Sequence, residues 1–264
     1  MSRYAQMFDR LAAANEIAFG GFLMLGHPDP ARCSVLLDAL VEGGADMVEV
    51  GIPFSDPVAD GPVIAAAAKQ ALENGVRTAD CLAMIADFRA LHPDVPVGIL
   101  TYANIVVARD RERFCAELAT AGADSLLVAD VPSIEAAPWA ETAVAAGIDP
   151  VLIAAPTTPQ PALETIARLG RGYTYCVARL GVTGSGVEPT MGHRDLFANL
   201  ARLDAPPPVL GFGISSPGHV AAAAASGAAG VISGSALVER AALPDGVDQV
   251  RAFCAQMKAA TRRA

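Results

Sequence analysis

Eight short apolar runs, rich in β-branched residues, recur along the chain with amphipathic segments between them. Apolar runs of this length without polar alternation are typical of parallel strands that are buried on both faces. The segments between them have helical periodicity and often end close to a glycine, as helices commonly do. The predicted strands cover residues 18–25, 46–52, 95–102, 125–130, 149–155, 172–178, 207–213 and 229–234.

The alternation of strands and helices predicts an α/β fold in which the parallel sheet closes into a (β/α)8 barrel, the TIM barrel. A doubly wound open sheet is the alternative, which the absence of a GxGxxG phrase after the first strand disfavours. A chain of 264 residues suits one such barrel, so we expect a single domain over residues 1–264. The predicted helices include an extra amphipathic one in residues 1–16 and barrel helices at 30–45, 109–123, 133–147 and 216–229.

Charge and composition exclude several classes of partner. A formal net charge of -9 would repel a polyanion, so nucleic acid is not an expected partner. No apolar run reaches the ~18 residues of a membrane helix, and the N-terminus lacks a secretory signal, so we expect a cytoplasmic protein without membrane contact. The five cysteines form no CxxC pair and the four histidines have no ligand spacing, so neither disulfides nor a metal site are expected.

Three glycine-rich phrases follow the last three predicted strands: GVTGSG at 181–186, GFGISSP at 211–217 and SGSALVE at 233–239. Glycine lets a phosphate approach the backbone, and a helix that begins there offers free N–H groups and the positive end of its dipole. Barrel enzymes often bind phosphate in the loops after strands 7 and 8. The phrases therefore predict an anion site made largely of backbone amides, although each one alone could be a tight turn.

Catalytic chemistry is narrowed by what the barrel strands lack. Lysine occurs only at Lys69 and Lys258, neither in a predicted strand, so covalent imine chemistry is excluded. Glu49 lies between Val48 and Val50 in the second strand, where an inward carboxyl group is desolvated. Desolvation raises its pKa and favours proton transfer near neutral pH, whereas a carboxylate that ties down a loop is the plainer interpretation.

Asp60 lies in the long segment after the second strand, within the phrase ADGP. An aspartate there is more often a turn residue, so its functional interpretation depends on Glu49 and on this loop folding over the barrel mouth. Tyr175, two residues after Tyr173 in the sixth strand, is either an inward hydroxyl group or simply core, and Tyr102 is similarly ambiguous.

These residues lie within phrases that resemble the tryptophan synthase alpha chain family. The matching phrases run in the same order over essentially the whole chain, and PFSDPxADGP is highly specific. They are VEVGIPFSDPVADGP, LTYANIV, LLVADVP, GYTYCVARLGVTG, LGFGISSP and GVISGSALV.

The resemblance implies a lyase of tryptophan biosynthesis that cleaves indole-3-glycerol phosphate to indole and glyceraldehyde 3-phosphate. It implies a partner beta chain in an α2β2 heterotetramer with allosteric coupling, with pyridoxal phosphate in the beta chain and no cofactor in this chain. Glu49 would be the acid and base that protonates indole C3 and handles the glycerol hydroxyl proton. Asp60 would accept from the indole N–H and stabilise positive charge on the ring, and Tyr175 would lie near the glycerol portion.

The resemblance also assigns binding residues. The indole and substrate pocket would be formed by Phe22, Leu100, Leu127, Ile153 and Thr183. The phosphate would be held by Gly184, Phe212, Gly213, Gly234 and Ser235.

Three positions depart from the family pattern: Met24, His27 and Leu180. They lie beside the two predicted loops and leave the catalytic carboxyl groups intact. A stand-alone indole-releasing lyase, and a non-catalytic barrel that binds a phosphorylated ligand to activate a beta chain, are therefore alternatives. A phosphate-binding barrel isomerase is a further alternative, which would not need the ADGP loop.

Overall fold

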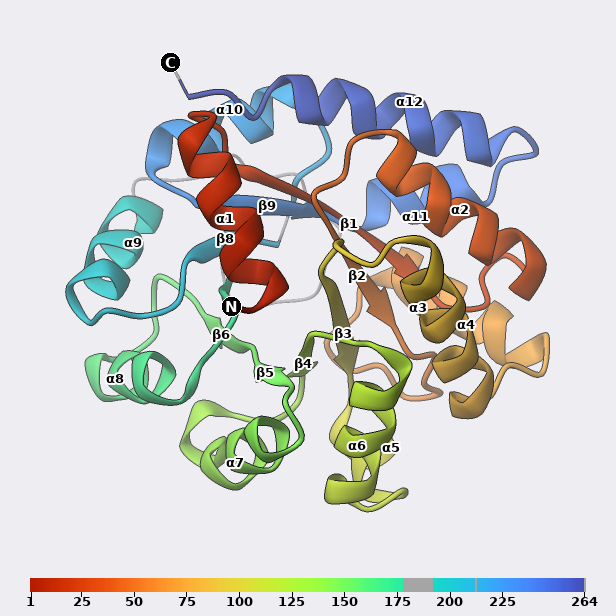
Figure 1. Cartoon of the computed structure of the whole chain (residues 1–264), viewed down its shortest axis with the longest axis horizontal. Coiled ribbons are helices and arrows are strands. Elements are labelled where there is room, and N and C mark those ends of the chain that lie inside the picture. Colours follow the sequence, from red (N-terminus) through yellow and green to blue (C-terminus); the bar gives the residue numbers. More distant parts are fainter. Residues whose placement is uncertain (178–191, 212, 264) are drawn as a thin grey trace.

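The computed structural model describes residues 1–177, 192–211 and 213–263. Its strands form one sheet of nine parallel strands in the order β5-β4-β3-β2-β1-β9-β8-β7-β6, surrounded by helices (Figure 1). The strands are β1 (Ala18–Met24), β2 (Met47–Gly51), β3 (Val97–Thr101), β4 (Ser125–Val128), β5 (Asp149–Pro150), β6 (Leu152–Ala154), β7 (Thr174–Cys176), β8 (Pro208–Leu210) and β9 (Gly230–Ser233).

The two ends of the sheet are consecutive in the chain, and this nearly closes the barrel. β5 pairs with β4 and β6 pairs with β7, while Val151 alone separates β5 from β6. The backbone N–H of Val151 still donates to the carbonyl of Leu126, 3.0 Å away. The predicted strand 149–155 is thus two short strands, because the chain turns from one neighbouring strand to the other at this point. The predicted TIM barrel is confirmed.

The observed strands are shorter than the predicted ones, mainly at their carboxyl ends. The prediction for 207–213 becomes β8, which ends at Leu210, and that for 125–130 becomes β4, which ends at Val128. The residues beyond these ends continue the apolar run but enter loops at the mouth of the barrel. Hydrophobicity alone therefore overestimated the strand length where the chain leaves the sheet.

Helices lie outside the strands (Figure 1). α2 ends at Glu42 rather than in the predicted 30–45. The predicted helix 133–147 is a short 3-10 turn followed by α7, because Pro138 has no N–H to donate and fits only the first turn of a helix. The barrel helices are α2 (Pro30–Glu42), α3 (Pro62–Glu73), α4 (Thr78–Leu91), α5 (Ala103–Val107), α6 (Arg111–Ala121), η1 (Ser133–Glu135), α7 (Ala137–Ala145), α8 (Gln160–Leu169), α9 (Gly192–Arg202), α10 (Pro217–Ser226), α11 (Ser235–Ala241) and α12 (Gly246–Ala259).

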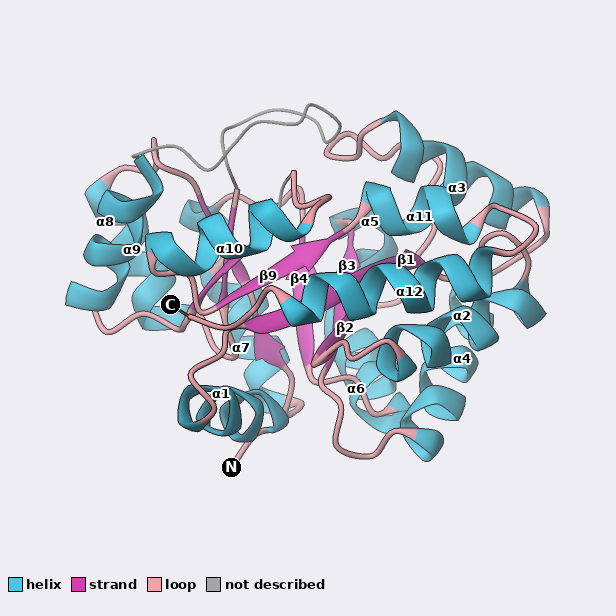
Figure 2. Ribbon diagram, turned by 90° about the horizontal axis from the view of Figure 1, so that it is seen from above, coloured by secondary structure: helices cyan, strands magenta, loops and turns pink. Residues whose placement is uncertain are grey.

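The extra N-terminal helix is α1 (Arg3–Ala13), capped by the side chain of Ser2. Its buried face consists of Tyr4, Met7 and Leu11. The hydroxyl of Tyr4 contacts Ser125 at the first residue of β4, so α1 covers the amino-terminal ends of the strands. Figure 2 shows α1 and the N-terminus on one side of the barrel strands. Among the described residues, none of the helices combines the length and the hydropathy needed to cross a bilayer.

Candidate active site

A cavity of about 260 Å³ opens among the loops that follow the strands. In a parallel barrel these loops form the catalytic face. The residues that the sequence predicted and that line the cavity are Phe22, Glu49, Asp60, Leu100, Tyr175, Gly213, Gly234 and Ser235. The sequence did not single out the other lining residues, which include Ile64, Ile232 and Glu239.

Glu49 lies in the middle of β2, and its side chain lines the cavity while the residue is only 2% exposed. One carboxylate oxygen, Oε1, accepts a hydrogen bond of 3.0 Å from the hydroxyl of Tyr173. Burial raises the pKa of Glu49 from 4.5 to about 7, against the opposing effect of the Tyr173 hydrogen bond, and the charge of Asp60 raises it further. The carboxyl group can therefore give or take a proton near neutral pH.

Asp60 lies in the loop between β2 and α3, and this loop reaches over the barrel mouth to Tyr102 at the end of β3. The hydroxyl of Tyr102 accepts a 3.2 Å hydrogen bond from the N–H of Ala59 and hydrogen-bonds to the Asp60 carboxylate. The Tyr102 ring also stacks on Phe54, with the ring centroids 5.2 Å apart. Burial raises the pKa of Asp60 to about 6, and the Tyr102 hydrogen bond opposes that rise.

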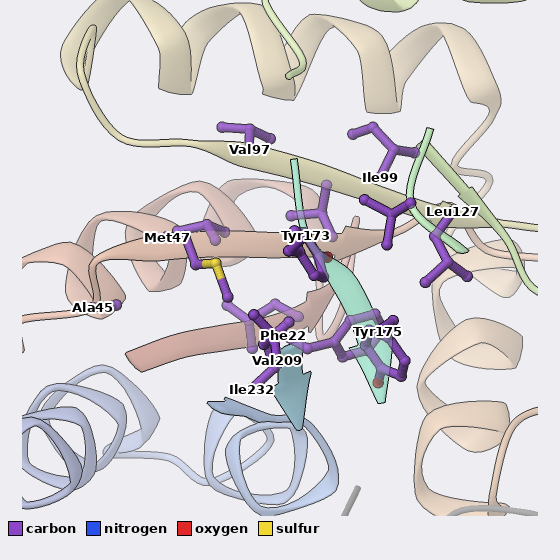
Figure 3. Packing of buried hydrophobic residues seen from close by; sticks show 14 of the residues in the cluster. Phe22, Ala45, Met47, Val97, Ile99, Leu127, Tyr173, Tyr175, Val209 and Ile232 are labelled. Atoms are coloured by element: carbon purple, nitrogen blue, oxygen red, sulfur yellow. The ribbon is translucent and has the colours of Figure 1, made fainter. Parts of the chain in front are cut away.

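Two tyrosines from one strand segment enter the barrel interior, as Figure 3 shows together with Phe22 and Ile232. Tyr175 donates a 2.9 Å hydrogen bond to the carbonyl of Gly211, and Tyr173 donates to Glu49. Sequence reasoning used Tyr173 only as a spacing reference and missed its contact with Glu49. The two-residue interval between the tyrosines, which places both on one face of a strand, was the available indication.

The apolar side of the cavity is formed in part by Phe22, Leu100 and Ile232. Leu127 and Ile153 stand next to cavity residues in the sheet: Leu127 pairs with Leu100, and Ile153 with Tyr175. Neither belongs to the cavity lining among the residues that the structure describes. Their assignment to the substrate pocket stays a prediction.

The two described glycine-rich loops meet at one side of the cavity. Gly213 has a φ of 75°, which glycine adopts without strain, and Ser216 caps α10 by accepting from the N–H of His219. Gly234 precedes α11 directly, and an added Cβ there would find only Phe22, at 3.9 Å. The hydroxyl of Ser233 donates to the carbonyl of Ile214 at 2.6 Å, so β9 is tied to the first loop.

The cavity is acidic in its described part. Its lining contains the carboxyl groups of Glu49, Asp60 and Glu239, and none of its described lining residues is lysine or arginine. Lys69 pairs with Glu73 on α3, and Lys258 pairs with Asp46 and Glu16. Within the described ranges, no group of three or more histidine, cysteine, aspartate or glutamate side chains could hold a metal ion.

Some predicted positions lie outside the described residues: Thr183, Gly184 and Phe212, as well as the departure Leu180. The other two departures are buried after or at the end of β1, with Met24 2% exposed and His27 5% exposed. Met24 packs with Phe22 over the backbone of Gly51, where an added Cβ would lie 2.9 Å from the Met24 Cε atom. Both departures therefore belong to the packing around the site.

Comparison with known proteins agrees with this geometry. The family model described as "Tryptophan synthase alpha chain" matches residues 8–262. The chain is 47% identical over 268 residues to the tryptophan synthase alpha chain of Aeromonas hydrophila, with 100% of both chains covered. It is 45% identical over 269 residues to that of Cronobacter sakazakii, covering 99% of each.

Solved structures give the same relationship. A structure of Mycobacterium tuberculosis tryptophan synthase has a TM-score of 0.91 and 33% sequence identity, covering 100% of this chain and 99% of the other. With the family model and the sequence relatives, this places the fold, the order of the motifs and the barrel mouth in one group of enzymes. The chain belongs to the tryptophan synthase alpha chain family.

Proposed function

We propose that this chain cleaves indole-3-glycerol phosphate to indole and glyceraldehyde 3-phosphate through the carboxyl groups of Glu49 and Asp60. Members of the family are lyases of tryptophan biosynthesis. The observation that carries the proposal is that two carboxyl groups with raised pKa values line one cavity, and the charge of one acts on the other.

Glu49 supplies the proton chemistry. In its protonated form it gives a proton to indole C3, which makes that carbon a leaving group. The resulting carboxylate takes the proton of the hydroxyl on the adjacent glycerol carbon as the carbon–carbon bond breaks and the aldehyde forms. The electron pair of the broken bond passes to the indole ring, so Glu49 returns to its starting state. A pKa of about 7 suits both directions of transfer.

Asp60 stabilises the positive charge that C3 protonation places on the indole ring nitrogen. Its loop brings the carboxylate to the side of the cavity that also carries Leu100 and Phe22. Tyr102 keeps the carboxylate charged by lowering its pKa against the effect of burial. A fixed negative charge in a water-poor site stabilises a developing cation more than it would in water. Tyr175 lies in the same cavity, where its hydroxyl bonds to Gly211.

The phosphate is held mainly by backbone amides of the loops at Gly213, Gly234 and Ser235. No described lysine or arginine lines the cavity, so direct charge neutralisation is not available from these residues. The helix that begins at Pro217 and the open backbone at Gly234 supply N–H groups instead. The predicted contributions of Gly184, Thr183 and Phe212 belong to the same proposal.

The test is an assay of indole release with wild-type protein and two matched variants. Glu49→Gln keeps the shape and can still accept from Tyr173, but it cannot transfer a proton, so turnover falls by about 10²–10⁴-fold. Glu239→Gln removes another carboxylate of the same cavity and keeps turnover within about tenfold of wild type. A Glu49→Gln variant with more than about a tenth of wild-type turnover contradicts the proposal.

The partner is a beta chain, since members of this family pair with one, and that chain carries the pyridoxal phosphate. Three exposed apolar side chains follow three neighbouring strands at the barrel mouth: Val58 at 74%, Val107 at 59% and Ile134 at 86% exposure. Exposed apolar groups on one rim favour a protein partner. We infer that this rim contacts the beta chain in a cytoplasmic α2β2 heterotetramer.

Ile134→Asp tests that rim by weakening association with a beta chain in calorimetry. Leu91→Asp is its control, because Leu91 is 67% exposed but ends α4, close to the start of β3 at the other end of the barrel. Indole release measured with and without the beta chain also separates the alternatives. A stand-alone lyase gives the same rate in both, and a non-catalytic barrel or an isomerase releases no indole in either.

A further inference from the structure

The barrel interior contains a cluster of hydroxyl groups directly beneath Glu49. Its members are Tyr4 of α1, Ser125 of β4 and Tyr173 beside β7, and all three are 1% exposed. The hydroxyls of Tyr4 and Ser125 are 2.8 Å apart, and the Tyr4 and Tyr173 rings pack edge to face with centroids 5.3 Å apart. Tyr173 in turn donates to Glu49.

The register of the sheet explains why these groups meet. Glu49 pairs with Gly98 on β3, and Gly98 pairs with Ser125 on β4, so the three residues form one layer of the barrel. A Cβ at Gly98 would lie 3.0 Å from both the Ser125 Oγ and the Tyr4 hydroxyl, and 3.5 Å from the Tyr173 hydroxyl. The missing side chain of Gly98 therefore provides the space in which the three hydroxyls converge.

We propose that Tyr4 is a positioning residue for Glu49: the Tyr4–Ser125 pair holds the Tyr173 ring where its hydroxyl group binds the Glu49 carboxylate. The inference rests on the proposed role of Glu49 and extends it to the N-terminal helix. α1 covers the barrel bottom, so a helix outside the (β/α)8 repeat determines the orientation of the acid at the barrel mouth. Nothing in this role requires Tyr4 to touch the substrate.

The charges around the cluster are few and assignable. Glu49 experiences the charge of Asp60, and both Tyr173 and Tyr175 experience the charge of Glu49. Burial raises the pKa of Tyr173 well above its usual range, so this hydroxyl stays protonated and remains a donor. A donor fixed toward a carboxylate stabilises its charged form, which lowers the pKa of that group.

On the α1 side, Tyr4 experiences the charges of Asp124, Glu49 and Asp149. Asp124 is neutralised by Arg3 and Arg89, at 2.9 and 2.7 Å. Burial is the main cause that raises the pKa of Tyr4 well above its usual range. Both phenols therefore stay neutral while Glu49 titrates, and replacing them with phenylalanine removes hydrogen bonds without changing charge.

The experiment titrates the Glu49 carboxyl by carbon-13 NMR in protein labelled at the glutamate side-chain carboxyl carbon. Its resonance is assigned by its loss in Glu49→Gln. Tyr173→Phe should raise the midpoint from about 7 by about one pH unit, because the stabilising donor is gone. Tyr4→Phe should raise it in the same direction by about half as much. The double variant should not exceed Tyr173→Phe, because Tyr4 acts through Tyr173.

Two further variants separate positioning from general stability. Ser125→Ala removes the same hydrogen bond from the other side and should reproduce the Tyr4→Phe shift, which covers the case of a poorly folding Tyr4→Phe. Ser2→Ala removes the N-cap of α1, destabilising the helix while leaving the Tyr4 hydroxyl in place, and should leave the midpoint unchanged.

The inference is overturned if Tyr173→Phe moves the midpoint but Tyr4→Phe and Ser125→Ala do not, or if Ser2→Ala moves it equally. It is also overturned if the shifts of the double variant simply add. The pH profile of kcat tests the proposed function separately. If the NMR midpoints move while the kcat profile does not follow them, Tyr4 still positions Glu49 but Glu49 is not the acid and base of the reaction.

Discussion

Tyr102 and Asp60 share a hydrogen bond across the mouth of the barrel, although Tyr102 ends β3 and Asp60 lies in the loop after β2. The same hydroxyl also accepts from Ala59, so one side chain binds both the backbone and the carboxylate of this loop. Burial and this hydrogen bond act in opposite directions on the pKa of Asp60. Tyr102 therefore positions Asp60 and also helps to keep it ionised.

Tyr102→Phe should make turnover more sensitive to acid. Without the hydrogen bond the pKa of Asp60 rises above about 6, so a larger fraction is protonated and uncharged at pH 6. The ratio of variant to wild-type kcat should fall about fivefold between pH 8 and pH 6. Phe54→Leu, which weakens the ring stacking but keeps the hydroxyl, should show the wild-type ratio. A Tyr102→Phe ratio that is constant with pH would give Tyr102 a purely mechanical role.

Asp60→Asn should lower turnover more than affinity. The positive charge on the indole ring exists mainly in the transition state, so its stabilisation appears in kcat, with a loss of about 10²-fold. The affinity for glycerol 3-phosphate, which has no indole ring, should be unchanged in calorimetry. If the variant raises KM alone and keeps kcat, Asp60 only positions the loop.

Glu49→Gln should stabilise the fold at alkaline pH. The folded pKa of Glu49 is raised, so its contribution to stability is present below about 4.5 and is lost as pH rises through about 7. The amide has no such dependence. Relative to wild type, its free energy of unfolding should increase by up to about 3 kcal/mol between pH 4.5 and pH 8 in urea titrations. An unchanged difference across that range would mean that Glu49 is not desolvated.

The barrel could be predicted because its strands are short apolar runs and its helices amphipathic, and both patterns are local. The split of residues 149–155 into β5 and β6 could not, since it depends on which strand lies on each side of Val151. Likewise the α7 start was misplaced by a helical pattern that ignored Pro138. Period and composition determine the elements, while tertiary contacts determine where they end.

The site divides in the same way. Glu49 and Asp60 were predictable because a carboxyl group within a buried strand, and another in a long loop after it, are locally unusual. Tyr173 was not, because its partner Glu49 is 124 residues away. Glu239 reads as an ordinary polar position of a helix, and only the packing of α11 brings it to the cavity. Long-range contacts of this kind have no counterpart in residue spacing.

Gly211→Ala should damage the site through Tyr175. An added Cβ would lie 2.0 Å from the Tyr175 Cζ atom and 2.3 Å from its hydroxyl oxygen, so the ring must move and its hydrogen bond to Gly211 is strained. Overpacking of this kind typically costs about 1–3 kcal/mol, which thermal unfolding would measure, and kcat should fall with it. Gly218→Ala is the control, because its Cβ would meet only Ser216, at 3.7 Å. Equal effects of both variants would exclude the Tyr175 explanation.

Gly234→Ala tests whether the phosphate approaches bare backbone at the start of α11. The protein itself has room for the methyl group, since only Phe22 lies within 4 Å of it, at 3.9 Å, and a φ of −110° is open to other residues. Stability should therefore stay close to wild type, while the methyl group occupies the space that the phosphate needs and weakens glycerol 3-phosphate binding about tenfold. Ser235→Ala is the matched control, because it removes a hydroxyl but keeps the N–H, and it should bind more tightly than Gly234→Ala.

Calorimetry at about 50 mM and about 500 mM salt separates this amide site from a charge-based one, because salt screens exposed ion pairs much more than buried contacts. An amide site keeps most of its affinity at the higher salt concentration and loses it in Gly234→Ala. The opposite result, with a wild-type Gly234→Ala affinity and binding that disappears at high salt, would mean that cations outside the described lining hold the phosphate.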